Sequence, residues 1–207
     1  MKGKDLVERV YNQIKMDLIL GKFDKSGMLN EQTFADMYGC SRTPVREAAG
    51  RLVLEGFLNK FPSKGYIVRI PGEIELRELR ECRYILECSV LQKIIENASD
   101  DQITKLLDLP EGNLEDVLYI NNMIFHKRMA QIAGNDKLQE MIEGFLYLLV
   151  RPIVTGRYHS FDNYAAEVNK SSTPISKEHK FLVQALLKRD FKEASQILKD
   201  DIYPKKY

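Results

Sequence analysis

Hydrophobic positions in the first part of the chain recur at helical spacing, and turn-forming residues separate the groups. Residues 6–20 carry apolar side chains on one helical face, and Gly21 follows as a stop. A second helix is expected to begin near Asn30, which is a favourable N-cap. Its buried side is expected to hold Phe34, Met37 and Tyr38.

A third helix and a hairpin follow. The helix is predicted over residues 43–55, because its apolar positions share one face and Gly56 stops it. Two short apolar stretches at 57–61 and 66–70 then predict strands. The segment Pro-Ser-Lys-Gly at 62–65 separates them and is typical of a turn.

The remainder of the chain shows only helical patterns. Pro71-Gly72 is the best boundary, so we expect two domains, residues 1–71 and 72–207, in a mostly α protein. Helices of the second domain are predicted over residues 73–97, 100–108, 113–133, 135–157, 162–169, 174–188 and 191–202.

The third helix has two chemically different faces. Its apolar stripe consists of Val45, Ala48, Ala49, Leu52 and Val53. Arg42, Thr43 and Arg46 lie away from this stripe, near the amino-terminal end. In a helix-turn-helix the second helix places this end in the DNA major groove, where arginine binds guanine with two hydrogen bonds and hydroxyls reach phosphates. The order helix, helix, glycine turn, helix and hairpin therefore predicts a winged helix-turn-helix, with the hairpin as its wing.

A plainer interpretation is open for the same arginines. Arg42 and Arg46 could be solvated side chains that pair with Glu31, Asp36 or Glu47. The DNA-binding interpretation instead expects that no carboxylate of the chain neutralises these guanidinium groups. Phosphates and purine edges of the DNA would then be their binding partners.

Charge and cysteine content narrow the class of protein. Residues 1–71 hold 12 lysines and arginines against 8 acidic residues, whereas residues 72–207 hold 19 against 22, which suits an anionic partner at the amino-terminal end. Three cysteines without CxxC spacing favour reduced thiols and a cytoplasmic protein. The longest apolar stretch is far shorter than the ~20 residues of a membrane span, so no membrane partner is expected.

The hairpin and third helix carry a specific motif. The run Cys-Ser-Arg-Thr-Pro-Val-Arg-Glu-Ala at 40–48, with Arg-Leu at 51–52, Glu-Gly at 55–56 and Lys-Gly-Tyr-Ile-Val at 64–68, resembles the winged helix-turn-helix of GntR-family bacterial transcription regulators. The resemblance covers about residues 5–70. Many members carry arginine where Gln32 stands, which implies one phosphate contact fewer here. The DNA-binding residues that the resemblance implies are Gln32, Ser41, Arg42, Thr43, Arg46, Lys64 and Gly65.

Polar residues of the second domain are spaced so that they can converge. Asn122 and His126 are four residues apart and share one helical face. His179 and Asp201 lie on consecutive predicted helices at similar distances from the joint near residues 189–190. If that joint is an antiparallel turn, the two side chains reach about the same height, because each helical residue rises ~1.5 Å.

The second domain resembles the all-helical ligand-binding domain of the FadR-like branch, the FCD type. The resemblance rests on Arg-Tyr-Ile-Leu-Glu at 83–87, Phe-His at 125–126 with Gly-Asn at 134–135, and Glu-His at 178–179 with Ala185, Asp190 and Ala194. Many members of that branch hold a divalent metal with one aspartate and three histidines, and the metal helps to bind a small carboxylate effector. His126 and His179 match that set, whereas Asn122 replaces the aspartate and Asp201 replaces the third histidine.

The altered donor set keeps the total charge of the usual one. Two imidazoles and a carboxylate suit Zn, Ni, Mn or Fe, and Asn122 could add a weak amide oxygen. A metal-free polar pocket is one alternative, and ordinary surface histidines that form no site are the other. The effector-binding residues are expected to be Arg83, Asn122, His126 and His179, with Arg83 gripping a carboxylate. A salt bridge from Arg83 to Glu87, one turn later, is the alternative for that arginine.

Together these features predict a sequence-specific DNA-binding regulator and not an enzyme. We expect a repressor that reads a pseudo-palindromic operator as a homodimer and responds to a carboxylate effector in its helical bundle. An architectural DNA-binding protein without effector control is one alternative. A metal-dependent hydrolase built on His126, His179 and Asp201 is another, although the sequence has no HExxH motif.

Overall fold

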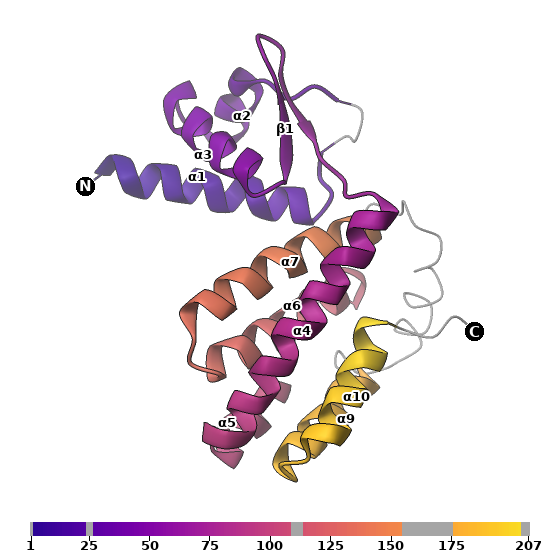
Figure 1. The fold of residues 1–207 in the computed structure, drawn as a ribbon. Helices are drawn as coiled ribbons and strands as arrows, with labels where there is room; N and C mark the ends of the chain where they lie inside the picture. Colours follow the sequence, from indigo (N-terminus) through magenta and orange to yellow (C-terminus); the bar gives the residue numbers. More distant parts are fainter. Residues whose placement is uncertain (1, 24–26, 109–113, 155–175, 204–207) are drawn as a thin grey trace. The chain divides into compact units, whose positions relative to one another are not determined.

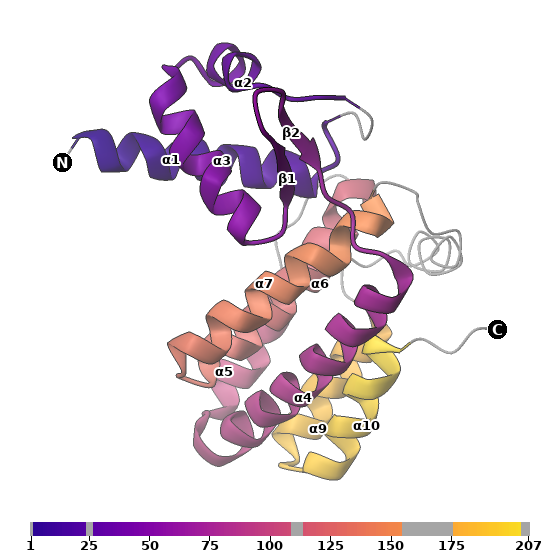
Figure 2. The ribbon, with the colours of Figure 1, turned by 45° about the horizontal axis from the view of Figure 1, so that its top comes forward.

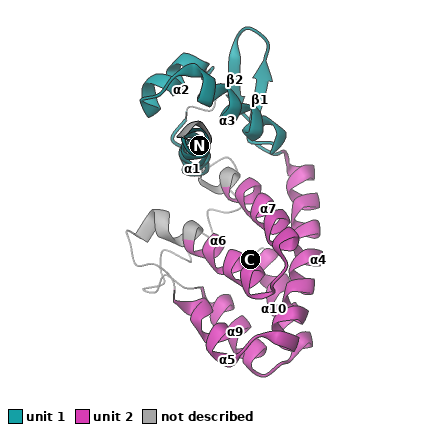
Figure 3. Ribbon diagram, turned by 90° about the vertical axis from the view of Figure 1, so that its left-hand side faces the viewer, with its two compact units in different colours: residues 1–71 teal, residues 72–207 magenta. Residues whose placement is uncertain are grey.

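The computed structural model describes residues 2–23, 27–108, 114–154 and 176–203, which form helices and one small sheet (Figure 1). The mostly helical fold predicted from the sequence is confirmed. The chain divides into two compact units, residues 1–71 and 72–207, and the division falls at Pro71-Gly72 (Figure 3).

The first unit has the predicted order of elements. They are α1 (Lys2–Ile19), α2 (Glu31–Tyr38), α3 (Arg42–Leu54), β1 (Leu58–Phe61) and β2 (Gly65–Val68). Asn30 caps α2 as expected, because its side chain accepts a hydrogen bond from the Thr33 amide. Helix α1 packs across α3 and passes behind α3 and the hairpin in the view of Figure 2, whereas the short helix α2 packs against α3.

The core of this unit forms where α3 meets α1. Val45, Ala48, Ala49 and Leu52 are fully buried on the predicted stripe of α3, whereas Val53 is only half-buried. The prediction that α2 buries Met37 is wrong, since this side chain is 53% exposed. Ala35 completes the buried side of α2 beside Phe34, and Met37 points away from that side.

The wing is tied to the loop that precedes α2. Strands β1 and β2 are antiparallel, with Phe61 opposite Gly65. The Tyr66 amide donates to the Leu29 carbonyl at 2.7 Å, and the Leu29 amide donates to the Tyr66 carbonyl at 2.8 Å. Gly65 has a φ of 124°, and a Cβ there would lie 2.5 Å from the Leu29 carbonyl oxygen. A glycine is thus needed at this position by the fold itself, independently of the DNA contact that the family resemblance implied for Gly65.

The second unit is built around one long helix. Its elements are α4 (Glu73–Asn97), α5 (Asp100–Thr104), the 3₁₀ turn η1 (Lys105–Leu107), α6 (Leu114–Ile132), α7 (Asp136–Val154), α9 (Lys177–Leu187) and α10 (Phe191–Ile202). Helix α4 contacts α6, α7, α9 and α10 (Figures 1 and 2). The helix predicted at 100–108 is divided between α5 and η1, and the one predicted at 162–169 lies outside the described residues. None of the helices in the described part of the chain has the length and apolar character needed to cross a bilayer.

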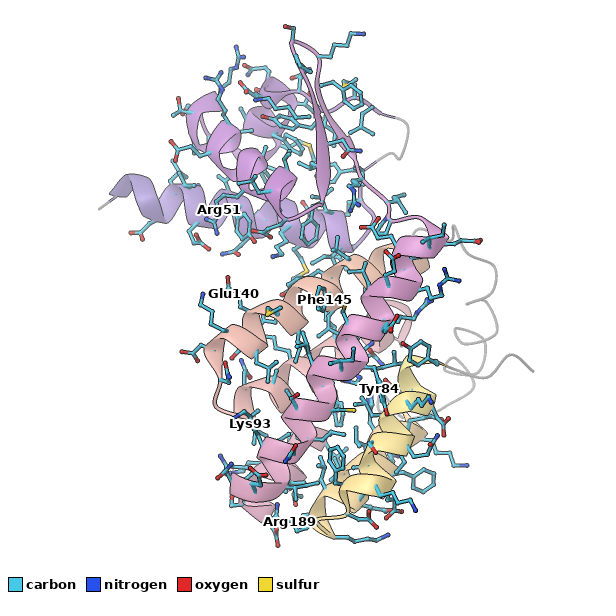
Figure 4. All side chains as sticks on the ribbon, viewed as in Figure 1. Arg51, Tyr84, Lys93, Glu140, Phe145 and Arg189 are labelled. Atoms are coloured by element: carbon cyan, nitrogen blue, oxygen red, sulfur yellow. The ribbon has the colours of Figure 1, made fainter. Side chains whose placement is uncertain are left out.

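Helices α9 and α10 form the antiparallel pair expected near residues 189–190. Arg189 takes a left-handed conformation with a φ of 58°, and Asp190 caps α10 by accepting from the Glu193 amide. Figure 4 shows Arg189 at this turn, where its guanidinium donates to Asp100 at 2.6 Å. The turn sets the height at which residues of α9 and α10 face each other.

We expect Gly65→Ala to lower the free energy of unfolding by about 1–3 kcal/mol, because the new side chain meets the Leu29 carbonyl in a left-handed backbone conformation. The measurement is urea-induced unfolding of the full chain, followed by circular dichroism. Gly50→Ala is the matched control, because it sits inside α3 and a Cβ at this position would have nothing within 4 Å of it. It should stabilise the protein by about 0.5–1 kcal/mol. Equal effects of the two substitutions would contradict this account of Gly65.

Candidate nucleic-acid interface and metal centre

The amino-terminal end of α3 presents cations and hydroxyls to solvent. Arg42 is the first residue of α3, and Arg46 lies one turn later on the same side. Their side chains are 59% and 61% exposed. Ser41 occupies the N-cap position without a side-chain capping bond, and Thr43 is exposed. Hydroxyls and first-turn amides at a helix start are groups that can bind phosphate.

The expectation that these guanidinium groups have no partner within the chain is wrong. The Arg46 Nε and Nη2 atoms donate to Glu31 at 2.8 and 2.7 Å, and Arg42 Nη2 donates to the same carboxylate at 3.2 Å. Hydrogen bonds from Arg46, followed by those from Arg42, hold the pKa of Glu31 at about 2. Glu31 was one of the partners considered from the sequence. Both guanidinium groups remain at the surface, so the pairing does not bury them.

The other residues expected at DNA also lie at the surface of this unit. Gln32 on α2 is exposed, and its amide donates to Asp36 at 2.7 Å. Lys64 is exposed in the turn of the wing, and Gly65 begins β2. The structure therefore places the candidate DNA contacts on α2, on α3 and at the wing.

The second unit brings together the four polar residues that the sequence singled out. His126 Nε2 of α6 lies 3.1 Å from Asp201 Oδ2 of α10, and His179 Nε2 of α9 lies 3.6 Å from Asp201 Oδ1. The Asn122 amide nitrogen is 3.4 Å from His179 Nε2. One ligand atom from each of His126, His179 and Asp201 lies within 4.8 Å of the others. The His179 ring stacks on Phe125, which fixes its plane.

Sequence reasoning missed a second buried carboxylate in this cluster. Glu87 of α4 is fully buried and lies 2.7 Å from His126 Nδ1. It also accepts a 2.7 Å hydrogen bond from Arg83 Nε, so the salt bridge weighed as an alternative for Arg83 is the one found. Arg83 Nη2 is 3.6 Å from Asp201, and its side chain is 8% exposed. The Arg-x-x-x-Glu spacing on one helix was the available signal for this pair.

Charges in the cluster are mutually balanced. Burial alone would raise the pKa of the Glu87 carboxyl, but Arg83 and His126 hold this pKa below its usual value. Burial likewise opposes ionisation of Asp201, and His126 still holds the pKa of that carboxyl well below its usual value. The two carboxylates raise the pKa of His126 against its burial. Burial lowers the pKa of His179 to about 3, so this imidazole is neutral.

The residues present fit a divalent metal ion. His126 Nε2 and Asp201 Oδ2 are buried 3.1 Å apart, and His179 Nε2 lies 3.6 Å from the same carboxylate, so each residue directs one donor atom at the space between them. Because Glu87 is ionised, His126 Nδ1 must donate to it, which leaves Nε2 as the atom directed at Asp201. Two imidazole nitrogens and one carboxylate oxygen are donors that Zn²⁺ and its neighbours in the first transition row accept.

Both units match known protein families. A model of the FCD domain matches residues 78–203, and a model described as bacterial regulatory proteins, gntR family, matches residues 6–68. The HTH-type transcriptional regulator McbR of Escherichia coli (strain K12) is 30% identical over 155 residues, which span 69% of this chain and 68% of that protein. The gluconate operon transcriptional repressor of Bacillus subtilis (strain 168) is 25% identical over 198 residues, 88% of this chain and 76% of the repressor.

Solved structures share the fold. McbR/YncC from E. coli superposes with a TM-score of 0.74 at 23% identity, covering 95% of this chain and 93% of that one. A transcriptional regulator GntR from Rhodococcus sp. RHA1 superposes with a TM-score of 0.70 at 20% identity and the same coverage. At these identities the likeness establishes the fold alone.

We expect Arg83→Ala to destabilise the protein by about 3–5 kcal/mol, because it leaves Glu87 and Asp201 buried beside fewer positive charges. The matched control is Lys105→Ala, which removes an ion pair of the same four-residue spacing with Asp101 at the surface. That change should leave the stability close to that of the wild-type protein, because solvent screens an exposed ion pair. Thermal unfolding of both variants measures their stability relative to the wild-type protein. A small loss of stability in Arg83→Ala would contradict the charge balance described for the cluster.

Proposed function

The chain belongs to the GntR family of bacterial transcription regulators and carries an FCD domain, and from this premise we propose that it is a metal-assisted, effector-controlled repressor. It acts as a cytoplasmic homodimer on a pseudo-palindromic operator, with one α3 helix in each half-site. A repressor role agrees with the gluconate operon repressor among its relatives.

The observation that carries the DNA-binding part is the exposed start of α3. Arg42 and Arg46 lie one turn apart in solvent, beside the hydroxyls of Ser41 and Thr43. Arginine at this end of a recognition helix can read guanine, and the hydroxyls and first-turn amides can bind phosphates. Gln32 on α2 and Lys64 on the wing are exposed and would add further DNA contacts.

The metal proposal rests on the donors and the charge of the buried cluster. Metal binding requires both imidazoles to be neutral, so the proton that the two carboxylates favour on His126 would be released. Glu87, Asp201 and Arg83 would then together carry a charge of about −1, which a divalent ion on His126, His179 and Asp201 would change to about +1. Asn122 would supply an amide oxygen if its amide turned over. A bound metal would act there as a Lewis acid for a carboxylate.

An anionic effector fits the charge that a metal would create. Arg83 already donates to Glu87, so its contribution is to balance the carboxylates rather than to offer an open grip. His126, His179 and Asn122 would face the effector together with the metal. Binding there would change operator affinity through a coupling free energy of about 1–3 kcal/mol.

Other functions have less support. The relatives are named transcriptional regulators, so we propose no enzymatic activity and set the metal-dependent hydrolase aside. An architectural DNA-binding protein without effector control would make no use of the buried donors of the second unit.

We expect Arg46→Ala to weaken operator binding by about 1–3 kcal/mol for each guanine that Arg46 binds, because alanine cannot form those hydrogen bonds. The operator is obtained by selecting bound duplexes from a randomised library, and affinity is measured by fluorescence anisotropy. Arg51→Ala is the control, since Figure 4 places Arg51 on the same helix and its guanidinium pairs with Glu8. Unchanged operator affinity in the Arg46 variant would refute the proposed role of α3.

Elemental analysis of purified protein should find about one equivalent of Zn, Ni, Mn or Fe per chain. Asp201→Asn should weaken metal binding at least about 100-fold, because it removes the charged ligand. Asp200→Asn is the matched control, since the neighbouring carboxylate accepts from Gln196 and should not affect the metal. A folded protein that contains no metal and takes none up would end this part of the proposal.

A further inference from the structure

Glu31 occupies a central position among the exposed cations of the first unit. It is the first residue of α2, directly after the N-cap Asn30, and its side chain is only 15% exposed. Its Oε1 atom accepts from Arg46 Nε, and its Oε2 atom accepts from both Arg46 Nη2 and Arg42 Nη2. A single carboxylate on α2 therefore fixes two guanidinium groups on α3.

The pairing uses only one edge of the Arg46 guanidinium. This planar group has five N–H donors, which form one edge at Nε and Nη2 and another at Nη1 and Nη2. Glu31 occupies the first edge at 2.8 and 2.7 Å. The second edge keeps the parallel pair of donors that matches O6 and N7 of guanine, and the side chain as a whole is 61% exposed.

The same carboxylate also reduces the local positive charge. Arg42 and Arg46 with Glu31 carry about one net positive charge instead of two, and Glu31 remains ionised at neutral pH. Attraction to phosphate depends on the number of unneutralised cations and is independent of sequence. A base contact instead depends on the orientation of the guanidinium. Glu31 acts on the two kinds of contact in opposite directions.

We propose that Glu31 is a specificity-determining positioning residue, which aims the outer edge of Arg46 at a guanine and weakens attraction to unrelated DNA. The inference rests on the proposed function, in which Arg46 contacts the operator. Glu31 itself need not touch DNA. Its effect appears in the ratio of operator affinity to non-specific affinity, a quantity that a purely structural role would leave unchanged.

The test compares the full-length wild-type protein with Glu31→Gln on two duplexes, the operator selected by the wild-type protein and a scrambled duplex of the same composition. We expect the affinity ratio to fall by at least about tenfold in the variant, because glutamine cannot hold both donors of Arg46. Binding to the scrambled duplex should become tighter. Its logarithmic dependence on salt concentration should steepen by about one unit, as expected for one additional phosphate contact.

Two further variants separate orientation from charge. Glu47→Gln removes one negative charge from α3 at an exposed residue, whereas the arginines donate to Glu31, so its affinity ratio should stay within about twofold of wild type. Glu31→Asp keeps the charge but shortens the side chain, so it should lose discrimination as Glu31→Gln does. Circular dichroism tests whether each variant is folded. If Glu31→Gln does not fold, the affinity ratio of Glu31→Asp is compared with that of the wild-type protein instead.

The outcomes distinguish this inference from the proposed function. If Arg46→Ala weakens operator binding while both Glu31 variants keep the wild-type ratio, Glu31 has no positioning role and only this inference fails. If Glu47→Gln lowers the ratio as much as Glu31→Gln does, the effect is one of general charge and the inference also fails. If Arg46→Ala leaves operator binding unchanged, the role of α3 fails and the inference fails with it.

Discussion

Two buried carboxylates constrain how the helices of the second unit pack. Glu87 on α4 and Asp201 on α10 are removed from water, and a carboxylate can remain ionised there only beside compensating charge and hydrogen bonds. Arg83 and His126 supply that compensation, and each of them approaches both carboxylates. The four groups are satisfied only as a set. The cluster therefore fixes the register of α4, α6 and α10 and leaves donor atoms directed at one point.

The two units use arginine–carboxylate pairs in opposite ways. Arg83 and Glu87 are enclosed by the bundle. If either residue left the pair for another partner, the other would remain as an uncompensated buried charge, which is strongly destabilising. Arg46 and Glu31 are paired with similar distances, but the arginine is largely in solvent and keeps one donor edge available. Burial, and not the geometry of the pair, decides whether such a pair is fixed within the protein or can extend to a further ligand.

Much of the fold could be predicted from the sequence because it depends on local patterns. Apolar periodicity, the Asn30 cap and the glycine stops predicted the helices that the structure describes in both units to within a few residues. Met37 was misassigned because a short helix has few positions from which to judge its buried side. The pairing of Glu31 with Arg46 spans 15 residues, and that of Glu87 with His126 spans 39. Such contacts depend on how helices cross, which a single sequence does not specify.

The backbone bridge between Leu29 and Tyr66 has a mechanical consequence. It joins the wing to the chain two residues before Glu31, so a displacement of β2 is transmitted to the start of α2 and from there to the guanidinium of Arg46. In the proposed complex, the hairpin and α3 would then respond to a duplex as one body. Base-pair changes beneath the wing and beneath α3 should accordingly be energetically non-additive, although the two elements would contact different stretches of the proposed operator.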